Sequence, residues 1–252
     1  GAPKAWTDID LIFQVPNSGK STAAQKGEWK GIKKVPMKLL KNWRVAFGTS
    51  GVELGLSTSE SGQVGVFAEQ LENWAFIKDS IRAAQIAGIT GGPPARGGPP
   101  TEGEEKDETS KDVIRVLNGF AYTGGSTLAA AKAADEGLVQ VTHLDGSKSA
   151  VEWAKRNAQE LEIADTAVRW MSEDCLTFLQ REVKRGNKYE GLIFDPPAFG
   201  RGGGGKSAKT WKLDSDLPKL AALFPDLLSE EAAFVLLTCH DPKWSSEKLA
   251  KR

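Results

Sequence analysis

The sequence predicts an α/β protein built on a doubly wound, mostly parallel sheet, with a small N-terminal β-rich extension. From residue 113 onward, apolar runs alternate with stretches in which apolar residues recur every three or four positions, the pattern of successive βαβ units. Residues 91–112 are rich in Gly, Pro and acidic side chains and have no large apolar residue, which indicates a flexible linker. Before the linker, two short β-prone runs flank turn residues at 48–51.

Each element is expected from its own residues, because continuous apolar runs predict strands and apolar stripes at helical spacing predict helices. In the C-terminal part, the expected strands span residues 113–117, 139–144, 167–171, 189–194 and 233–238, and the expected helices span residues 126–134, 147–162, 176–184 and 213–228. In the N-terminal part we expect strands at 43–47 and 52–56 and then a helix whose apolar face consists of Leu71, Trp74, Ile77, Ile81 and Ala84. Three parts follow: an N-terminal hairpin extension with a helix at 1–90, a flexible linker at 91–112 and an α/β domain at 113–252.

Composition excludes several classes of protein. The 252 residues include 33 Lys and Arg, 33 Asp and Glu, and two Cys. Balanced charge argues against binding nucleic acid by bulk charge alone, and two cysteines cannot form a disulfide framework. No segment approaches the roughly 20 apolar residues of a membrane span, and residues 1–10 show no signal peptide. We therefore expect no membrane and no secretion, with a location in the cytoplasm or in an organelle (mitochondrion or plastid).

Sheets of this kind bind ligands beyond the carboxyl ends of their strands. The Gly-rich segment 118–125 follows the first strand, and its glycines allow the backbone to come close to a ligand. Asp145 follows the second strand, where an acid typically accepts hydrogen bonds from ribose hydroxyls. Asp174 follows the third strand, where its carboxylate could receive an adenine amino group. In this order, the three features indicate a ligand that contains adenosine.

The fourth strand ends in a rigid acidic turn at 195–200. Pro196 and Pro197 fix the backbone and remove two N–H donors, so the strand stops and presents Asp195. Beside a nucleoside site, such a turn suits proton handling or the clamping of a flat base on which Phe199 could stack. The alternative is an ordinary strand end that is terminated by proline and holds a satisfied Asp195.

These segments resemble class I S-adenosylmethionine-dependent methyltransferases, which have a Rossmann-like methyltransferase fold. More narrowly, the sequence is similar to the bacterial-type 23S rRNA large-subunit cytosine-C5 methyltransferases and their uncharacterised relatives. The resemblance is carried by residues 116–125, Asp145 with 147–150, Asp174 and 195–200. Residues 65–70 with Asn73 and Trp74 are similar to the segment that precedes the fold in that family and lies over the cofactor.

The resemblance implies S-adenosyl-L-methionine as the cofactor, RNA as the substrate and rRNA cytosine C5 as the methyl acceptor. It assigns the cofactor to Phe67, Gln70, Asn73, Asn118, Phe120, Tyr122, Thr123, Gly124, Asp145, Asp174 and Asp195. It assigns the substrate to Pro196, Pro197, Phe199 and Lys206. Catalysis is assigned to Asp195 and Cys239, whose thiolate would add to cytosine C6 so that C5 attacks the sulfonium methyl.

Cys239 also has a structural interpretation, since a single cysteine at a strand end is commonly a small buried hydrophobe. Where the family has a Ser-Cys-Ser-Gly-like run, this chain has Thr-Cys-His-Asp-Pro. His240 could lower the pKa of the thiol, but sequence neighbours along a strand point to opposite faces. Cys175, beside Asp174, is expected to be structural. The His and acidic residues show no metal-ligand spacing, so no metal is expected.

Two other patterns are ambiguous. Residues 200–207 match G-x-x-x-x-G-K-S, but a phosphate loop needs a strand directly before it and a helix directly after it. Because Pro196 and Pro197 come before this segment and a polar turn follows it, we expect a loop that orders over substrate. Residues 20–44 contain eight Lys and Arg and one acid, interleaved with tryptophan, which suits RNA phosphates with stacking platforms or, equally, a solvated basic edge.

The chain also departs from the family. The family's sheet continues past the fifth strand with an antiparallel hairpin, and members with known rRNA targets carry an N-terminal RNA-binding domain; we expect both to be missing. Either the chain is a fragment, or it needs a partner, or it has lost activity, and an uncovered sheet edge would invite a protein partner or self-association. The competing functions are a methyltransferase-like structural or assembly subunit, for instance of an organellar ribosome, and a nicotinamide-dependent oxidoreductase.

Overall fold

The structure is a computed structural model that describes residues 11–14, 28–31, 43–59, 62–89, 91, 113–134, 138–201, 210–241 and 243–250. The chain divides into two units. The first comprises Gly1–Gly48 and Glu53–Ala68, and the second comprises Thr49–Val52 and Glu69–Arg252. Residues 92–112 of the predicted linker, and most of the basic segment 20–44, lie outside the described residues.

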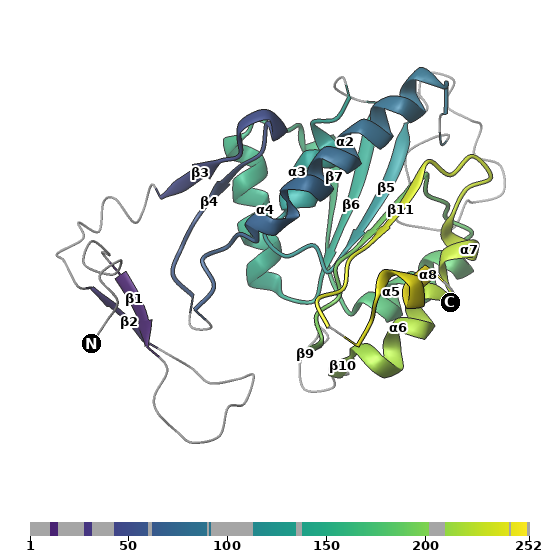
Figure 1. The fold of residues 1–252 in the computed structure, drawn as a ribbon. Helices are drawn as coiled ribbons and strands as arrows, with labels where there is room; N and C mark the ends of the chain where they lie inside the picture. The colour runs from purple at the N-terminus through teal and green to yellow at the C-terminus, as the bar shows by residue number, and fades with distance from the viewer. Residues whose placement is uncertain are drawn as a thin grey trace. The chain divides into compact units, whose positions relative to one another are not determined.

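Five parallel strands form the central sheet of the second unit (Figure 1), which confirms the predicted α/β class. They are β5 (Ile114–Gly119), β6 (Val139–Asp145), β7 (Val168–Ser172), β8 (Gly191–Phe194) and β11 (Phe234–Leu237). Their order across the sheet is β11-β8-β5-β6-β7. The strand order therefore reverses at β5, whose two neighbours are β6 and β8, and ligands bind at such a switch point in open α/β sheets.

Helices cover both faces of this sheet. They are α2 (Leu71–Ile86), α3 (Gly125–Ala131), α4 (Lys148–Glu160), α5 (Cys175–Lys184), α6 (Leu213–Ala221) and α7 (Phe224–Leu227). Leu117 of β5 packs in a buried cluster with side chains of α5, α6 and α7, whereas Asn118 bonds to Thr127 of α3. Successive side chains of a strand point to opposite faces, so these two groups of helices lie on opposite sides of the sheet. In Figure 1, α2 crosses in front of the strands beside α3.

The predicted helices of the βαβ units are present, and side-chain caps explain two of their starts. The hydroxyl of Ser147 accepts a hydrogen bond from the Ala150 N–H at the start of α4. The carboxylate of Asp174 accepts one from the Thr177 N–H at the start of α5. Both caps satisfy backbone donors that have no partner within the helix.

The prediction of one helix at 213–228 is wrong, because the segment forms the two helices α6 and α7. Pro225 lies in the first turn of α7, where its missing N–H costs nothing, but it cannot continue a preceding helix. The prediction of a loop at 200–207 is also incomplete. Residues 202–207 lie outside the described residues, and the residues on either side of the gap pair as the antiparallel strands β9 (Phe199–Arg201) and β10 (Thr210–Lys212). A short helix, α8 (Ser246–Ala250), follows β11.

In the first unit, β3 (Arg44–Ala46) and β4 (Glu53–Gly55) form the predicted antiparallel hairpin, with Val45 opposite Leu54. A second hairpin, β1 (Leu11–Gln14) with β2 (Glu28–Gly31), was not predicted. The indole N–H of Trp29 on β2 donates to the Ser59 carbonyl at 2.8 Å. This tryptophan of the basic segment therefore has a hydrogen-bond partner within the protein. The helix expected within residues 1–90 is α2, which belongs to the second unit.

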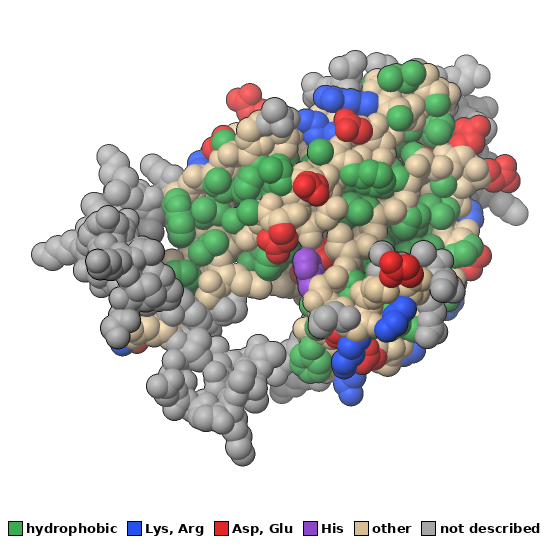
Figure 2. All heavy atoms as spheres, in the orientation of Figure 1, with side chains coloured by type: hydrophobic (Ala, Val, Ile, Leu, Met, Phe, Trp, Pro, Cys, Tyr) green, Lys and Arg blue, Asp and Glu red, His purple; other side chains and the backbone are tan. Residues whose placement is uncertain are grey.

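One edge of the sheet is formed by β11, which pairs with β8 and, within the described part of the chain, with no other strand. Leu71, Phe76 and Val235 keep 41%, 45% and 41% of their surface exposed. Figure 2 shows apolar side chains gathered over this face of the second unit. Association at this edge stays a prediction. None of the described helices is long and apolar enough to cross a membrane.

Candidate active site

The carboxyl ends of the strands bring four predicted site segments to one rim of the sheet. Gly119 at the end of β5 lies opposite Leu144 of β6 and Phe194 of β8. Leu237 at the end of β11 also lies opposite Phe194. The segments that begin at residues 120, 145, 195 and 238 therefore start within neighbouring positions of the same edge, although they are far apart in the sequence.

The segment after β5 is held in a strained conformation. Phe120 and Tyr122 have φ angles of 59° and 48°, and Gly124 has a φ of 94°. Non-glycine residues with positive φ are uncommon, and such strain clusters at binding and catalytic sites. A Cβ at Gly119 would collide with the ring of Phe194, so only glycine fits where the segment leaves the sheet.

Two of the predicted residues in this segment, Asn118 and Thr123, make buried contacts that hold it in place. The Asn118 side chain is buried and donates to the Thr127 hydroxyl at 2.9 Å. Thr127 in turn contacts Nδ1 of the buried His143 at 2.8 Å. Thr123 is also buried, and its carbonyl accepts a hydrogen bond from the Asn157 amide at 2.9 Å. These contacts fix the shape of the segment, so the predicted ligand contacts of Asn118 and Thr123 would come from their backbone.

Asp145 connects the segments that follow β5 and β6. Its Oδ2 accepts the Tyr122 N–H at 2.8 Å, and its Oδ1 accepts the Ser147 N–H at 2.7 Å. Burial raises the pKa of Asp145, while these two backbone donors lower it. Burial and the nearby Asp145 carboxylate also raise the pKa of Tyr122, so the phenol stays neutral beside it. A carboxylate held in this way keeps further lone pairs for hydroxyl donors of a ligand.

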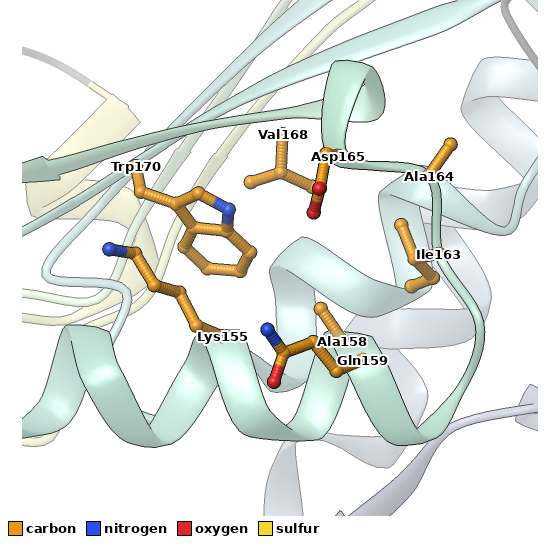
Figure 3. A pocket seen from close by; sticks show the side chains of 8 residues that line it. All are labelled: Lys155, Ala158, Gln159, Ile163, Ala164, Asp165, Val168 and Trp170. Atoms are coloured by element: carbon orange, nitrogen blue, oxygen red, sulfur yellow. The ribbon is translucent and has the colours of Figure 1, made fainter.

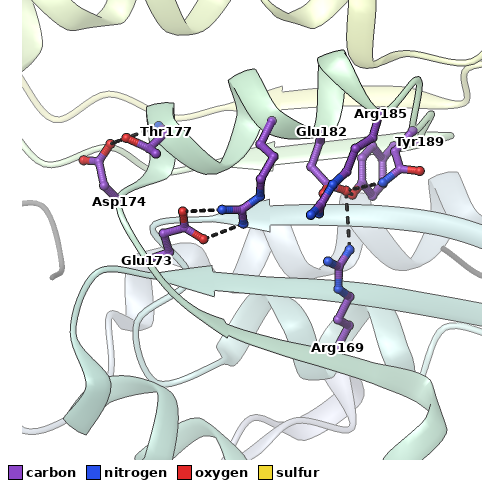
Figure 4. A network of polar contacts seen from close by, with 9 residues as sticks. Arg169, Glu173, Asp174, Thr177, Glu182, Arg185 and Tyr189 are labelled. Carbon is purple, nitrogen blue, oxygen red and sulfur yellow. Dashed lines mark hydrogen bonds and ion pairs between the residues drawn. The ribbon is translucent and has the colours of Figure 1, made fainter. Parts of the chain in front are cut away.

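The two acids after β7 have protein partners (Figure 4). Asp174 accepts hydrogen bonds from the backbone and the hydroxyl of Thr177 at 3.0 and 2.7 Å, all through Oδ1. Glu173 forms a bidentate pair with Arg181 at 2.7 and 2.6 Å, and this bonding raises the pKa of Arg181. Asp174 is thus the cap of α5, and its predicted contact with adenine stays a prediction that would use Oδ2.

Asp195 is the centre of a polar cluster built from three elements. Its Oδ2 accepts a hydrogen bond from the Gln70 amide at 3.1 Å, and Gln70 in turn accepts one from Asn73 at 2.7 Å. Its Oδ1 accepts a short hydrogen bond from the Thr238 hydroxyl and lies 3.3 Å from Nε2 of His240. The rim therefore brings the predicted site residues Asp195, Gln70 and Asn73 together and adds Thr238, while their contacts with a cofactor stay a prediction.

Thr238 is a member of this cluster that the sequence did not indicate. Its signal was the i, i+2 spacing with His240, because alternate residues of an extended segment face the same way. Cys239 lies between them and packs against the buried cluster that includes Leu117 and Phe194. Its thiol is thus directed away from the residues that bond to Asp195. Cys175 is buried, and burial raises the pKa of its thiol well above the usual value.

The turn after β8 leads into the β9–β10 hairpin. The carbonyl of Pro197 accepts the indole N–H of Trp211 at 2.7 Å, which ties the turn to β10. Trp211 also packs edge-on against Phe120, with ring centroids 4.8 Å apart. Phe199 is 60% exposed, as a stacking side chain must be. Lys206 lies outside the described residues.

Phe67 belongs to the first unit, so its predicted contact with the cofactor stays a prediction. Among the residues that the structure describes, no group of three or more His, Cys, Asp or Glu could hold a metal ion. A cavity of about 260 Å³ lies between α4 and β7, with Trp170, Lys155 and Asp165 in its wall (Figure 3). Its strand residues start at Val168, the amino end of β7, and no predicted site residue lines it.

Comparison with known proteins agrees with this fold. No protein-family model matches the sequence. The chain is 29% identical to a structure described as the SAM Dependent Methyltransferase from Agrobacterium tumefaciens, which aligns with a TM-score of 0.73 over 99% of this chain and 66% of that one. The fold and the rim place the chain in the class I S-adenosylmethionine-dependent methyltransferase superfamily.

Within that superfamily, its curated relatives are ribosomal RNA large subunit methyltransferases, which confirms the resemblance seen in the sequence. Ribosomal RNA large subunit methyltransferase I of Tolumonas auensis is 38% identical over 85 residues, or 34% of this chain and 21% of the relative. Ribosomal RNA large subunit methyltransferase K/L of Pseudoalteromonas translucida is 31% identical over 128 residues, or 51% of this chain and 17% of the relative. The match thus spans about a fifth of the length of these relatives.

Proposed function

We propose that the protein binds S-adenosyl-L-methionine at the rim and transfers its methyl group to RNA. The observation that carries this proposal is the carboxylate of Asp145 at the end of β6. Two backbone N–H groups hold it beside the strained segment that follows β5. The fold class supports the cofactor, and the names of the curated relatives support RNA as the substrate.

The residues at the rim fit this cofactor. Asp145 can accept hydrogen bonds from the ribose hydroxyls with the lone pairs that Tyr122 and Ser147 leave free. The strained segment 118–125 allows the backbone to approach the methionine portion, and Asp174 is available to the adenine. When bound, the cofactor supplies an electrophilic methyl group on its sulfonium sulfur. The chain's own residues position the acceptor, and the cluster around Asp195 accepts the proton that the acceptor loses.

Replacing Asp145 with alanine should abolish tight cofactor binding. The change removes a charged acceptor, and hydrogen bonds to a charged group contribute about 1.5–3 kcal/mol, so we expect the Kd to rise by roughly 10- to 150-fold. Equilibrium dialysis with tritiated S-adenosylmethionine measures this directly. Glu152→Ala is the matched control, because Glu152 is an exposed acid on α4 that pairs with Lys155 at 3.1 Å. A wild-type protein that retains no cofactor in dialysis would refute the proposed function.

The substrate class is tested by methyl transfer to separate fractions. Tritiated methyl groups from S-adenosylmethionine should appear in total RNA and be absent from total protein. Binding of the cofactor without transfer to either fraction would favour a methyltransferase-like structural or assembly subunit instead.

The cytosine-C5 form of this activity depends on Cys239. If cytosine C5 is the acceptor, Cys239→Ala should abolish turnover, because C5 becomes nucleophilic only after a thiolate adds to C6. The wild type should also form a covalent adduct with RNA that contains 5-fluorocytosine, seen on a denaturing gel, whereas the same RNA with ordinary cytosine should form none. Full activity of Cys239→Ala, with no adduct, would assign the methyl group to an exocyclic nitrogen or an oxygen, in line with the packing of Cys239 against the buried cluster.

A further inference from the structure

Methyl transfer to a nitrogen, an oxygen or C5 releases a proton, and the proposed function therefore needs a base at the rim. The described chain offers an exposed imidazole there. The side chain of His240 is 56% exposed, and its Nε2 lies 3.3 Å from Oδ1 of Asp195. The other histidine, His143 on β6, is 0% exposed and contacts Thr127 of α3, so it cannot reach a substrate.

The Asp195 carboxylate is held in place by groups other than His240. Thr238 donates to Oδ1 and Gln70 donates to Oδ2, and Asn73 donates to the Gln70 carbonyl oxygen. Gln70 is only 7% exposed, so the amide that holds Oδ2 of Asp195 is itself fixed within the protein. With its position fixed from two sides, the carboxylate can orient the imidazole of His240.

We propose that His240 is the general base of the methyl transfer and that Asp195 orients it. Nε2–H of His240 donates to Asp195, which leaves the Nδ1 lone pair free to face the acceptor. When the acceptor atom bonds to the methyl carbon, the carbon–sulfur bond breaks and its electron pair stays on sulfur. The proton on the acceptor passes to Nδ1. Its bonding pair stays on a nitrogen or oxygen acceptor, whereas at C5 it forms the C5–C6 double bond as the thiolate leaves C6. This inference rests on the proposed function and adds the residue that takes the proton.

The alternation of the segment after β11 separates this role from that of Cys239. Thr238 donates a hydrogen bond to Oδ1 of Asp195, and Nε2 of His240 lies 3.3 Å from the same oxygen, while Cys239 packs against the buried cluster. His240 stands where the family pattern has a small polar residue, and it lies on the side of the segment that faces the rim. A positioned base contributes roughly 10²- to 10⁴-fold to the rate of a proton-coupled step.

The first test measures single-turnover methyl transfer to total RNA by His240→Ala with saturating S-adenosylmethionine. We expect a loss of about 10²- to 10⁴-fold with an unchanged Kd for the cofactor, and partial recovery of the rate as imidazole is added. Lys243→Ala is the control, since Lys243 is a nearby residue with a 73% exposed side chain. A rate within twofold of wild type, or a low rate that imidazole does not raise, would overturn the proposal.

The second test does not depend on activity. The chain has two histidines, so a long-range ¹H–¹⁵N NMR spectrum contains two imidazoles, and His240→Ala assigns them. We expect neutral His240 to carry its proton on Nε2 and to lose this preference in Asp195→Asn. A proton on Nδ1 in the wild type would refute the dyad. Absence of methyl transfer by the wild type, with the Nε2–H form present, would instead refute the proposed function alone.

Discussion

Asp195→Ala should reduce methyl transfer to RNA by at least about 10²-fold, because one change removes the acceptor on which the whole rim cluster converges. Gln70 and Thr238 would each lose a hydrogen-bond partner, and His240 would lose the group that orients it. The expected effect on the fold is smaller, since the Asp195 side chain is 31% exposed and water can replace it. Single-turnover transfer of tritiated methyl groups to total RNA measures the effect.

Two controls make this result specific. Asp214→Ala removes an exposed acid that contacts Trp244 and Lys243, outside the rim cluster, and should transfer methyl groups at the wild-type rate. Asp195→Asn keeps the size and one acceptor oxygen but removes the charge, so its rate should fall between those of the wild type and Asp195→Ala. A rate for Asp195→Ala within threefold of the wild type would show that the cluster has no part in transfer.

Glu182→Ala should be the most destabilising of the substitutions considered. Glu182 on α5 is 0% exposed and accepts hydrogen bonds from Tyr189 at 2.6 Å and Asn187 at 2.8 Å (Figure 4). Arg169 and Arg185 approach the same carboxylate at 3.4 and 3.3 Å. Burial and the Glu182 charge raise the pKa of Tyr189, so the phenol remains a donor.

Removing one partner of such a buried pair leaves the other charge uncompensated, which costs about 3–5 kcal/mol of the free energy of unfolding. Urea unfolding followed by circular dichroism measures this loss. Glu173→Ala is the matched control, since the Glu173–Arg181 pair is bidentate but its side chains are 25% and 37% exposed. An exposed pair contributes about 1 kcal/mol or less, so equal midpoints for the two variants would contradict the prediction.

Much of the fold could be predicted from local patterns. Short runs rich in apolar residues correctly predicted the five parallel strands, because strands covered on both faces are rich in apolar side chains. The single helix predicted at 213–228 was wrong, since apolar spacing continues across Pro225 although the backbone hydrogen bonds cannot. The β9–β10 hairpin was missed because its three-residue strands carry too short a pattern to distinguish from a turn.

For the candidate site, the sequence was enough to predict which segments lie at the same edge of the sheet. A parallel sheet places the carboxyl ends of its strands at one rim, so residues after β5, β6 and β8 were expected along the same edge. That these three strands are adjacent came from the structure. The contacts that each side chain makes there became visible only in the folded chain. Asp195 bonds to Gln70, 125 positions away, and to Thr238, 43 positions away, and no local pattern encodes such contacts. The same is true of Cys239, whose direction depends on how the end of β11 is seated between the rim and the buried cluster. Contacts between residues far apart in the sequence set that orientation. They place Cys239 against the buried cluster and leave Thr238 and His240 on the side of the segment that faces Asp195.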